Sequence, residues 1–336
     1  MNYFEKQPQT KFQSQQEEFQ KQLMRSKSPI FEGAEGELYY IENVGRWLPS
    51  PKIINRREST KNLYKGIRHS ALSYFQLNDI EWWGQSENLY FPTGHTLSSQ
   101  IHCLNHLFAL RADKDAVLAI IQALLPNICE ILPSPIDEKF CYMDNYPYKT
   151  PSYISFEFTC ENRTLLNERC NKRGANCTSI DVFVYAKDSD NKHVLIPIEW
   201  KYTEAYVKAD DNKVKESVVE ERYLDKIDPT MSHLKGWQDS YYWDPHYELA
   251  RQSLLVEQII QKQLFEADYY QHIVVCPVEN TEMRKDAFSF KDSLSEIGQK
   301  QFYVIDPEEL LSPLNGNMAY DELLKYLKER YWGSVK

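Results

Sequence analysis

Two short apolar segments that end in charged residues place the strongest constraint on this chain of 336 residues. Residues 179–185 and 194–201 are rich in β-branched and aromatic side chains, and the turn-forming residues 188–191 separate them. This pattern predicts a β-hairpin. Alternate side chains of a strand share a face, so Glu199 and Lys201 point the same way while Ile198 and Trp200 point into the packing. Charges at the end of a buried strand are costly unless they are paired or bind an ion.

The arrangement of Asp181 on one strand and a Glu-x-Lys motif on the next resembles the active site of the PD-(D/E)XK phosphodiesterase superfamily, the fold of many restriction endonucleases. In that superfamily the two carboxylates and the carbonyl between Glu and Lys hold a divalent cation, and the Lys orients or activates water. The resemblance implies that Asp181, Glu199 and the Trp200 carbonyl bind Mg²⁺ or Mn²⁺ and that Lys201 is catalytic. Ile180 departs from the motif, because the superfamily name has proline at this position. That proline is often replaced by other residues in the superfamily. An exposed cross-strand ion pair at the end of a hairpin is the alternative interpretation.

A third strand is predicted just before this hairpin, because residues 153–159 alternate between apolar and polar side chains. The alternation puts Glu157 on the opposite face from Phe156 and Phe158. Some superfamily members carry an additional carboxylate before the Asp strand, so the resemblance makes Glu157 a candidate catalytic residue. The alternative is a solvated strand face.

Helices are predicted on both sides of these strands. Apolar residues recur at helical spacing from Thr96 to Leu110 and over residues 115–125. Asp244-Pro245 predicts a helix start with Asp as the cap, and this helix should cross over the sheet to a parallel strand at 272–277. In related nucleases a polar residue on the crossover helix supports the Lys or contacts phosphate, which singles out Gln252. A further strand is expected at 302–305 and a closing helix at 320–331.

The predicted fold is α/β, with a restriction-endonuclease-like core in which helices flank a central mixed β-sheet. This nuclease-like domain is expected to span residues 96–312, with an N-terminal extension, 1–95, packed on it and a C-terminal helix within 313–336. Residues 1–30 are expected to form an arm or a surface helix. Residues 31–95 show no clear periodicity and are expected to be irregular and partly β.

His102 and His106 lie four residues apart on the predicted helix that begins near Thr96. This is the spacing of two metal ligands on one helix face, but no Glu follows the first His, so the metalloprotease motif is absent. We therefore expect the two histidines to be satisfied by neighbours or exposed. The other polar positions of this helix carry almost no charge, so they are expected to look toward substrate or a neighbouring helix.

The formal net charge of −10 argues against a protein that coats nucleic acid along its whole surface, but it is compatible with local phosphate contacts. Two segments are locally basic, one around Arg56 and Arg57 and the other around Arg169 and Arg173. Both are candidates for binding the phosphate backbone of DNA. A solvated surface is the alternative for each.

The sequence predicts a cytoplasmic protein. The chain has no apolar run long enough for a membrane span and no secretory signal at its start. Its seven cysteines are odd in number and scattered, which is typical of reduced thiols.

The resemblance implies that the protein is a Mg²⁺-dependent endonuclease that hydrolyses DNA, in restriction or another defence role. The alternatives are a catalytically inactive nucleic-acid-binding or assembly protein that retains the fold, and a protein-interaction module. Recognition sequence, preference for DNA or RNA, cut geometry and oligomeric state stay open, a homodimer among them.

Overall fold

The computed structural model describes residues 9–41, 45–83, 91–137, 152–160, 165–168, 173, 177–206 and 212–333. It is an α/β protein with a central mixed sheet of seven strands flanked by helices, as the sequence predicts. The strands are β1 (Gly36–Ile41), β2 (Arg46–Ile54), β3 (Ile128–Leu132), β4 (Ser155–Phe158), β5 (Ile180–Asp188), β6 (His193–Trp200), β7 (Tyr269–Tyr270), β8 (His272–Val275) and β9 (Phe302–Ile305). The α-helices are α1 (Lys11–Arg25), α2 (Arg68–Leu77), α3 (Ser99–Leu107), α4 (Lys114–Leu124), α5 (Glu216–Arg222), α6 (His246–Gln261), α7 (Thr281–Ser293), α8 (Glu296–Lys300), α9 (Pro307–Leu311) and α10 (Asp321–Leu327).

The predicted hairpin forms from β5 and β6, which pair antiparallel. Its turn is fixed by Asp188, whose Oδ1 accepts hydrogen bonds from the backbone N–H groups of Asp190 and Lys192, each at 2.9 Å. Asn191 adopts the left-handed conformation that the turn needs, with φ of 62°. The turn thereby sets the register that brings the charged ends of both strands together.

The sheet runs β3-β5-β6-β8-β9, with β4 beside β5 and β7 beside β6. The strands β6, β8 and β9 are parallel. Parallel neighbours need a crossover, and α6 provides it between β6 and β8, as predicted. The carboxyl ends of β6, β8 and β9 therefore meet at one edge of the sheet.

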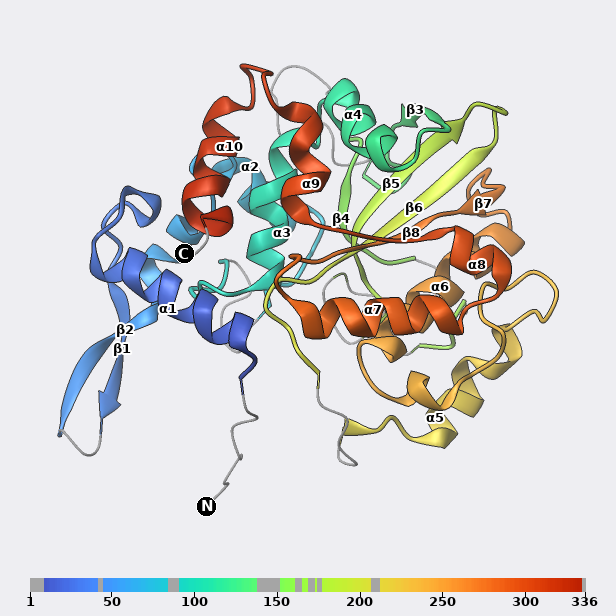
Figure 1. Cartoon of the computed structure of the whole chain (residues 1–336), viewed down its shortest axis with the longest axis horizontal. Coiled ribbons are helices and arrows are strands. Elements are labelled where there is room, and N and C mark those ends of the chain that lie inside the picture. The colour runs from blue at the N-terminus through green and yellow to red at the C-terminus, as the bar shows by residue number, and fades with distance from the viewer. Residues whose placement is uncertain are drawn as a thin grey trace.

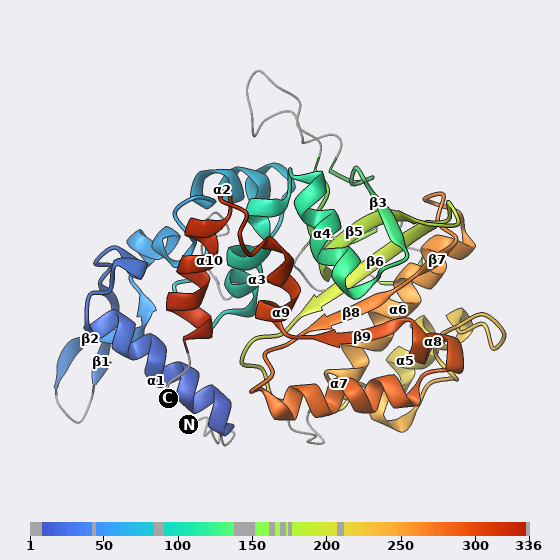
Figure 2. The same cartoon turned by 45° about the horizontal axis from the view of Figure 1, so that its top comes forward.

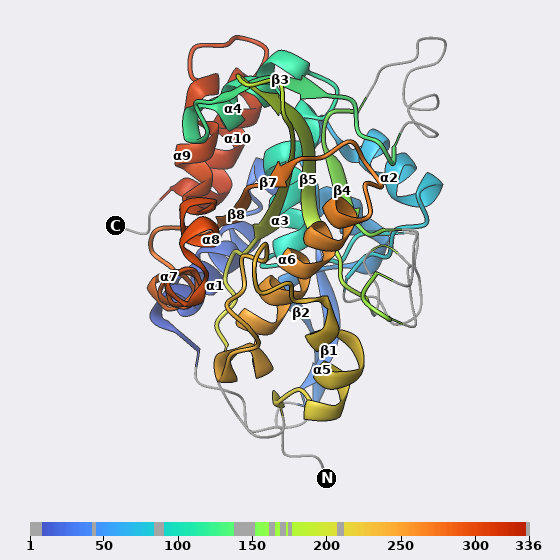
Figure 3. The same cartoon turned by 90° about the vertical axis from the view of Figure 1, so that its right-hand side faces the viewer.

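Two helical layers cover the sheet, as Figures 1 and 3 show. Helices α3, α4, α9 and α10 share one hydrophobic core with alternate strand residues such as Val182, Ile198 and Trp200. Helices α5, α6 and α7 share a second core with residues such as Phe183 and Leu195. Glu199 has the same parity on β6 as Leu195, so it faces the α6 layer, whereas Trp200 faces α3.

The N-terminal part forms a helix and a two-stranded hairpin. Helix α1 begins with a capping box in which Thr10 and Gln13 bond each other's backbone N–H. It lies beside the C-terminal segment, where Gln20 Nε2 donates to the Arg330 carbonyl at 2.9 Å. The hairpin of β1 and β2 projects from the body (Figures 1 and 2) and carries the exposed Trp47. The expected helix and partly β character are found here.

Two local predictions differ from the structure. Helix α6 begins at His246 with Pro245 at the N-cap position, one residue later than predicted, while the Asp244 carboxylate still accepts a hydrogen bond from the Glu248 backbone N–H in the first turn. The edge strand β3 and the helix α7 have no counterpart among the predicted elements. In the ranges that the structure describes, no helix is long and apolar enough to cross a membrane.

Candidate active site

Three carboxylates form a row across the adjacent strands β4, β5 and β6. Phe156 pairs with Val182 and Phe158 with Ile180, so the β4–β5 register puts Glu157 level with Asp181. The β5–β6 register, continued by one residue from Val182 and Ile198, puts Glu199 level with the same residue. Directly opposed residues are the closest side-chain neighbours in a sheet. We call Glu157, Asp181 and Glu199 the acidic row. Asp181 is at its centre.

Lys201 lies at one end of the acidic row, and its ammonium group contacts two carboxylates. Nζ is 2.5 Å from Glu199 Oε1 and 2.5 Å from Glu248 Oε2. The side chain is buried, and only 6% of Lys201 is exposed. Burial lowers the pKa of Lys201, but Glu199 and Glu248 outweigh burial and hold its pKa well above the usual value. The ammonium therefore stays charged.

Glu248 is a site residue that sequence reasoning missed. It lies in the first turn of α6, a place where Asp and Glu are common in any helix because they interact favourably with its dipole. The sequence alone therefore does not distinguish Glu248 from any other acidic residue in the first turn of a helix. Its contact with Lys201 becomes visible only when α6 is packed against β6.

Gln252, predicted from its place on the crossover helix, contacts Glu199 directly. Its Nε2 donates to Glu199 Oε2 at 2.6 Å and to the Ser179 carbonyl at 2.9 Å. Its Oε1 is buried, without a hydrogen-bond partner in the described part of the chain. Glu199 thus accepts a hydrogen bond from Gln252 on one oxygen and forms an ion pair with Lys201 on the other.

Glu157 is buried, with 3% of its surface exposed, so the solvated strand face is wrong. Gln100 Nε2 donates to its Oε1 at 2.7 Å and Ser179 Oγ to its Oε2 at 3.1 Å. Its φ is 50°, a left-handed conformation that costs about 1–3 kcal/mol for a residue other than glycine. This backbone also breaks the predicted alternation, because Phe156 and Phe158 lie in the two different cores.

The acidic row repels itself. Burial, and then the charge of Glu157, raise the pKa of Asp181 well above its usual value. Burial raises the pKa of Glu199 well above its usual value too, with Asp181 and Glu248 adding to the effect. Burial raises the pKa of Glu157 to about 7. Glu157 and Glu199 are buried and Asp181 is half-buried, and raised pKa values in such a cluster mark a site that is short of positive charge.

The chemistry of the acidic row suits a hard divalent cation, because Mg²⁺ and Mn²⁺ prefer oxygen ligands. The Trp200 backbone N–H donates to Asp181 Oδ2 at 2.8 Å, so the peptide between Glu199 and Trp200 lies against Asp181. Among the residues that the structure describes, however, no three His, Cys, Asp or Glu side chains already form a group that could hold an ion. In place of a metal ion, the positive charge beside Glu199 is the Lys201 ammonium. The donor atoms fit a cation, and the side chains would have to rearrange to hold it.

The raised pKa values of the acidic row should make the protein less stable at higher pH when no divalent cation is present. A carboxyl group whose pKa is raised in the folded state binds more protons folded than unfolded, so the free energy of unfolding falls as pH rises from about 4.5 to 7. We expect Glu157→Gln to remove part of this fall, while the exposed control Glu296→Gln leaves it unchanged. Urea denaturation in EDTA at pH 5 and pH 8 measures the difference. An identical fall in wild type and Glu157→Gln would contradict the raised pKa.

The predicted phosphate-binding arginines divide into three cases. Arg56 and Arg57 are exposed in the segment that follows β2. Arg173 is turned inward and is paired with Asp137 at 3.2 Å, and it also donates to the Tyr74 hydroxyl at 2.7 Å. Its prediction as a phosphate ligand is therefore wrong, since its charge is already neutralised in the interior. Arg169 lies outside the described residues.

The sheet, the acidic row and Lys201 together define a restriction-endonuclease-like protein of the PD-(D/E)XK superfamily, which confirms the resemblance seen in the sequence. The model of the family described as "Restriction Endonuclease associating with ARP" matches residues 9–332. The chain belongs to this family. No curated protein and no solved structure matches it.

Proposed function

We propose that this protein is a metal-dependent endonuclease that hydrolyses DNA phosphodiester bonds, in restriction or another defence role. The family supports a nuclease-like function. The observation that carries the proposal is the position of Lys201, a buried ammonium next to a row of three carboxylates on adjacent strands. Phosphodiester hydrolysis needs a positioned water, a donor beside that water and positive charge on the phosphate.

Each residue has a role that follows from its contacts. Asp181, Glu199 and the Trp200 carbonyl would hold Mg²⁺ or Mn²⁺, which when bound stabilises charge on the phosphate and lowers the pKa of water. Gln252 fixes the orientation of Glu199 through its 2.6 Å hydrogen bond. Lys201 acts as a charged hydrogen-bond donor to the attacking water. Glu157 adds negative charge to the cation site.

The alternative is a catalytically inactive nucleic-acid-binding or assembly protein that retains the fold. It is favoured by the ion pairs that Lys201 already makes with Glu199 and Glu248, because such pairs can serve structure alone. The family description also names an association with ARP. In this alternative the same residues are present and no cleavage occurs.

Incubation of the purified protein with plasmid DNA separates the two. The endonuclease proposal predicts nicked or linear plasmid with Mg²⁺ or Mn²⁺ and intact plasmid with EDTA. The Asp181→Asn variant prepared in parallel must lose the activity, since a contaminating nuclease would persist in it. DNA binding without cleavage under every metal condition would support the inactive alternative.

Arg56 and Arg57 give a test of how substrate docks. If both contact phosphates, the double variant Arg56→Ala/Arg57→Ala lowers affinity and reduces the salt slope of log K by about 1 for each arginine. The control Lys285→Ala/Lys300→Ala removes the same charge from the exposed surface of α7 and α8. Fluorescence anisotropy with labelled DNA over a range of salt concentrations measures both slopes. Equal slopes in the two double variants would make Arg56 and Arg57 ordinary surface charges.

A further inference from the structure

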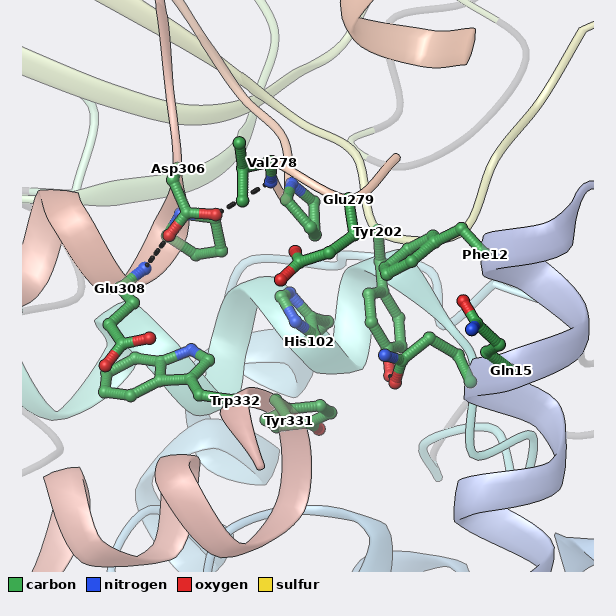
Figure 4. Close-up of a pocket in the computed structure, with 13 residues that line it drawn as sticks. Phe12, Gln15, His102, Tyr202, Val278, Glu279, Asp306, Glu308, Tyr331 and Trp332 are labelled. Atoms are coloured by element: carbon green, nitrogen blue, oxygen red, sulfur yellow. Dashed lines mark hydrogen bonds between the residues drawn. The ribbon is translucent and has the colours of Figure 1, made fainter. Parts of the chain in front are cut away.

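A cavity of about 200 Å³ lies at the carboxyl ends of the parallel strands, apart from the acidic row. Tyr202 follows β6, Glu279 follows β8 and Glu308 follows β9. Helix α1 and the C-terminal residues Tyr331 and Trp332 complete the lining (Figure 4). Carboxyl ends of parallel strands are a common place for ligands in α/β proteins. The volume is below the roughly 300–1,000 Å³ of sites for drug-sized ligands and suits a single flat ring system.

His102 lines this cavity and supplies a hydrogen-bond donor to it. The Trp200 indole N–H donates to His102 Nδ1 at 2.7 Å. Since an indole nitrogen can only donate, Nδ1 is an acceptor, and the neutral ring carries its proton on Nε2. No residue in the described part of the chain bonds this Nε2–H, although only 1% of His102 is exposed. The Nε2 atom is accessible from the cavity, so a ligand or a water molecule there can accept its hydrogen bond.

The walls of the cavity are flat and aromatic. The rings of Tyr202 and His102 stack, with centroids 4.0 Å apart and planes 17° apart. Phe12, Tyr331 and Trp332 add further aromatic surface. The Tyr202 and His102 rings already cover one another's inner faces, so a planar ligand would stack on the remaining aromatic surface of the lining.

The charges of the lining are negative. Glu279 and Glu308 are exposed residues of this lining, and in the view of Figure 4 the Glu279 carboxylate projects next to His102. No Lys or Arg is among the described lining residues, so the cavity does not suit a phosphate. Asp306 is occupied, because its carboxylate accepts the N–H groups of Val278 and Glu308. The lining of the cavity thus offers a donor at His102 and an acceptor at Glu279.

We propose that this cavity binds one nucleobase. The edge of a base carries hydrogen-bond acceptors next to N–H donors, which complements His102 and Glu279, and its ring stacks on the aromatic walls. A simple organic cation would satisfy Glu279 but leave the His102 N–H without an acceptor. The base can come from a free nucleoside or from a nucleotide turned out of a DNA strand, and its sugar and phosphate stay outside. The proposal does not require cleavage activity.

Calorimetry of the full chain with each of the four common nucleosides tests the binding. We expect at least one nucleoside to bind, and Glu279→Gln to weaken it about tenfold by removing the charged acceptor. The control Glu282→Gln makes the same change at an exposed position three residues away and leaves affinity unchanged. Ribose 5-phosphate is an anion that lacks a base, and choline is a cation that lacks an acceptor for the His102 N–H. Neither compound should bind.

A photocrosslinking arm distinguishes the two sources of the base. DNA oligonucleotides that contain 5-iodouracil are irradiated with the protein in EDTA, and crosslinked peptides are identified by mass spectrometry. A crosslink to Tyr331 or Trp332 that Glu279→Gln reduces indicates a base from the strand, whether or not nucleosides also bind. Nucleoside binding without this crosslink indicates a free nucleoside. The proposal is overturned if neither occurs, if choline binds instead, or if Glu279→Gln changes nothing.

Discussion

Lys201→Ala should abolish plasmid cleavage, with a loss of at least about 10²–10⁴-fold, the usual contribution of a positioned proton-transfer or donor group. Nζ lies 2.5 Å from Glu199 Oε1, so the ammonium is the donor held closest to the acidic row. The same substitution leaves Glu199 and Glu248 without their shared cation. We therefore also expect a lower midpoint of thermal unfolding, because removing one partner of a buried ion pair destabilises by roughly 3–5 kcal/mol.

Glu248→Gln provides the matched control, since it removes one of the two ion pairs of Lys201 and keeps the ammonium. If Lys201 is catalytic, Lys201→Ala loses cleavage whereas Glu248→Gln keeps it within about tenfold, a smaller effect than that of a lost catalytic group. If the ammonium is merely structural, the two variants lower stability and activity together. Wild-type cleavage by folded Lys201→Ala protein would remove Lys201 from the mechanism. Circular dichroism and cleavage assays on the same preparations measure both quantities.

The central hairpin could be predicted because its cause is local. Residues 179–185 and 194–201 alternate around a turn whose Asp188 and Asn191 have the required chemistry, and the pattern needs no distant partner. The crossover to β8 follows from chain direction and handedness, which are also general. By contrast, β3 is a short edge strand that pairs with β5 across about fifty intervening residues, and no local signal marks such a contact.

The site shows the same division. Asp181, Glu199 and Lys201 are recognisable from spacing on adjacent strands, and Gln252 from its place on the crossover helix. Glu248 and Gln100 join the site only through the packing of helices on the sheet. Arg173 was misassigned for the complementary reason, because a basic stretch in sequence does not reveal that Asp137 neutralises one of its members.

Asp181→Asn should abolish Mg²⁺ or Mn²⁺ binding and cleavage while it stabilises the metal-free protein. Asp181 is the centre of the acidic row, so its charge contributes both to the cation site and to the repulsion with Glu157 and Glu199. Asn has the same shape, and its carbonyl oxygen can still accept the Trp200 N–H that Asp181 accepts at 2.8 Å. Loss of function should thus come with a higher free energy of unfolding in EDTA at pH 8.

This combination of opposite effects is the signature of a site that keeps unfavourable charge for its chemistry. The control Asp190→Asn, in the exposed hairpin turn, should change neither quantity. Calorimetry measures cation binding, and urea denaturation in EDTA measures stability. Unchanged cation binding in Asp181→Asn would rule out Asp181 as a ligand. A ligand cluster without its cation gains stability when one charge is removed. If Asp181→Asn is instead less stable than the wild type, and neither protein binds a cation, the acidic row serves structure.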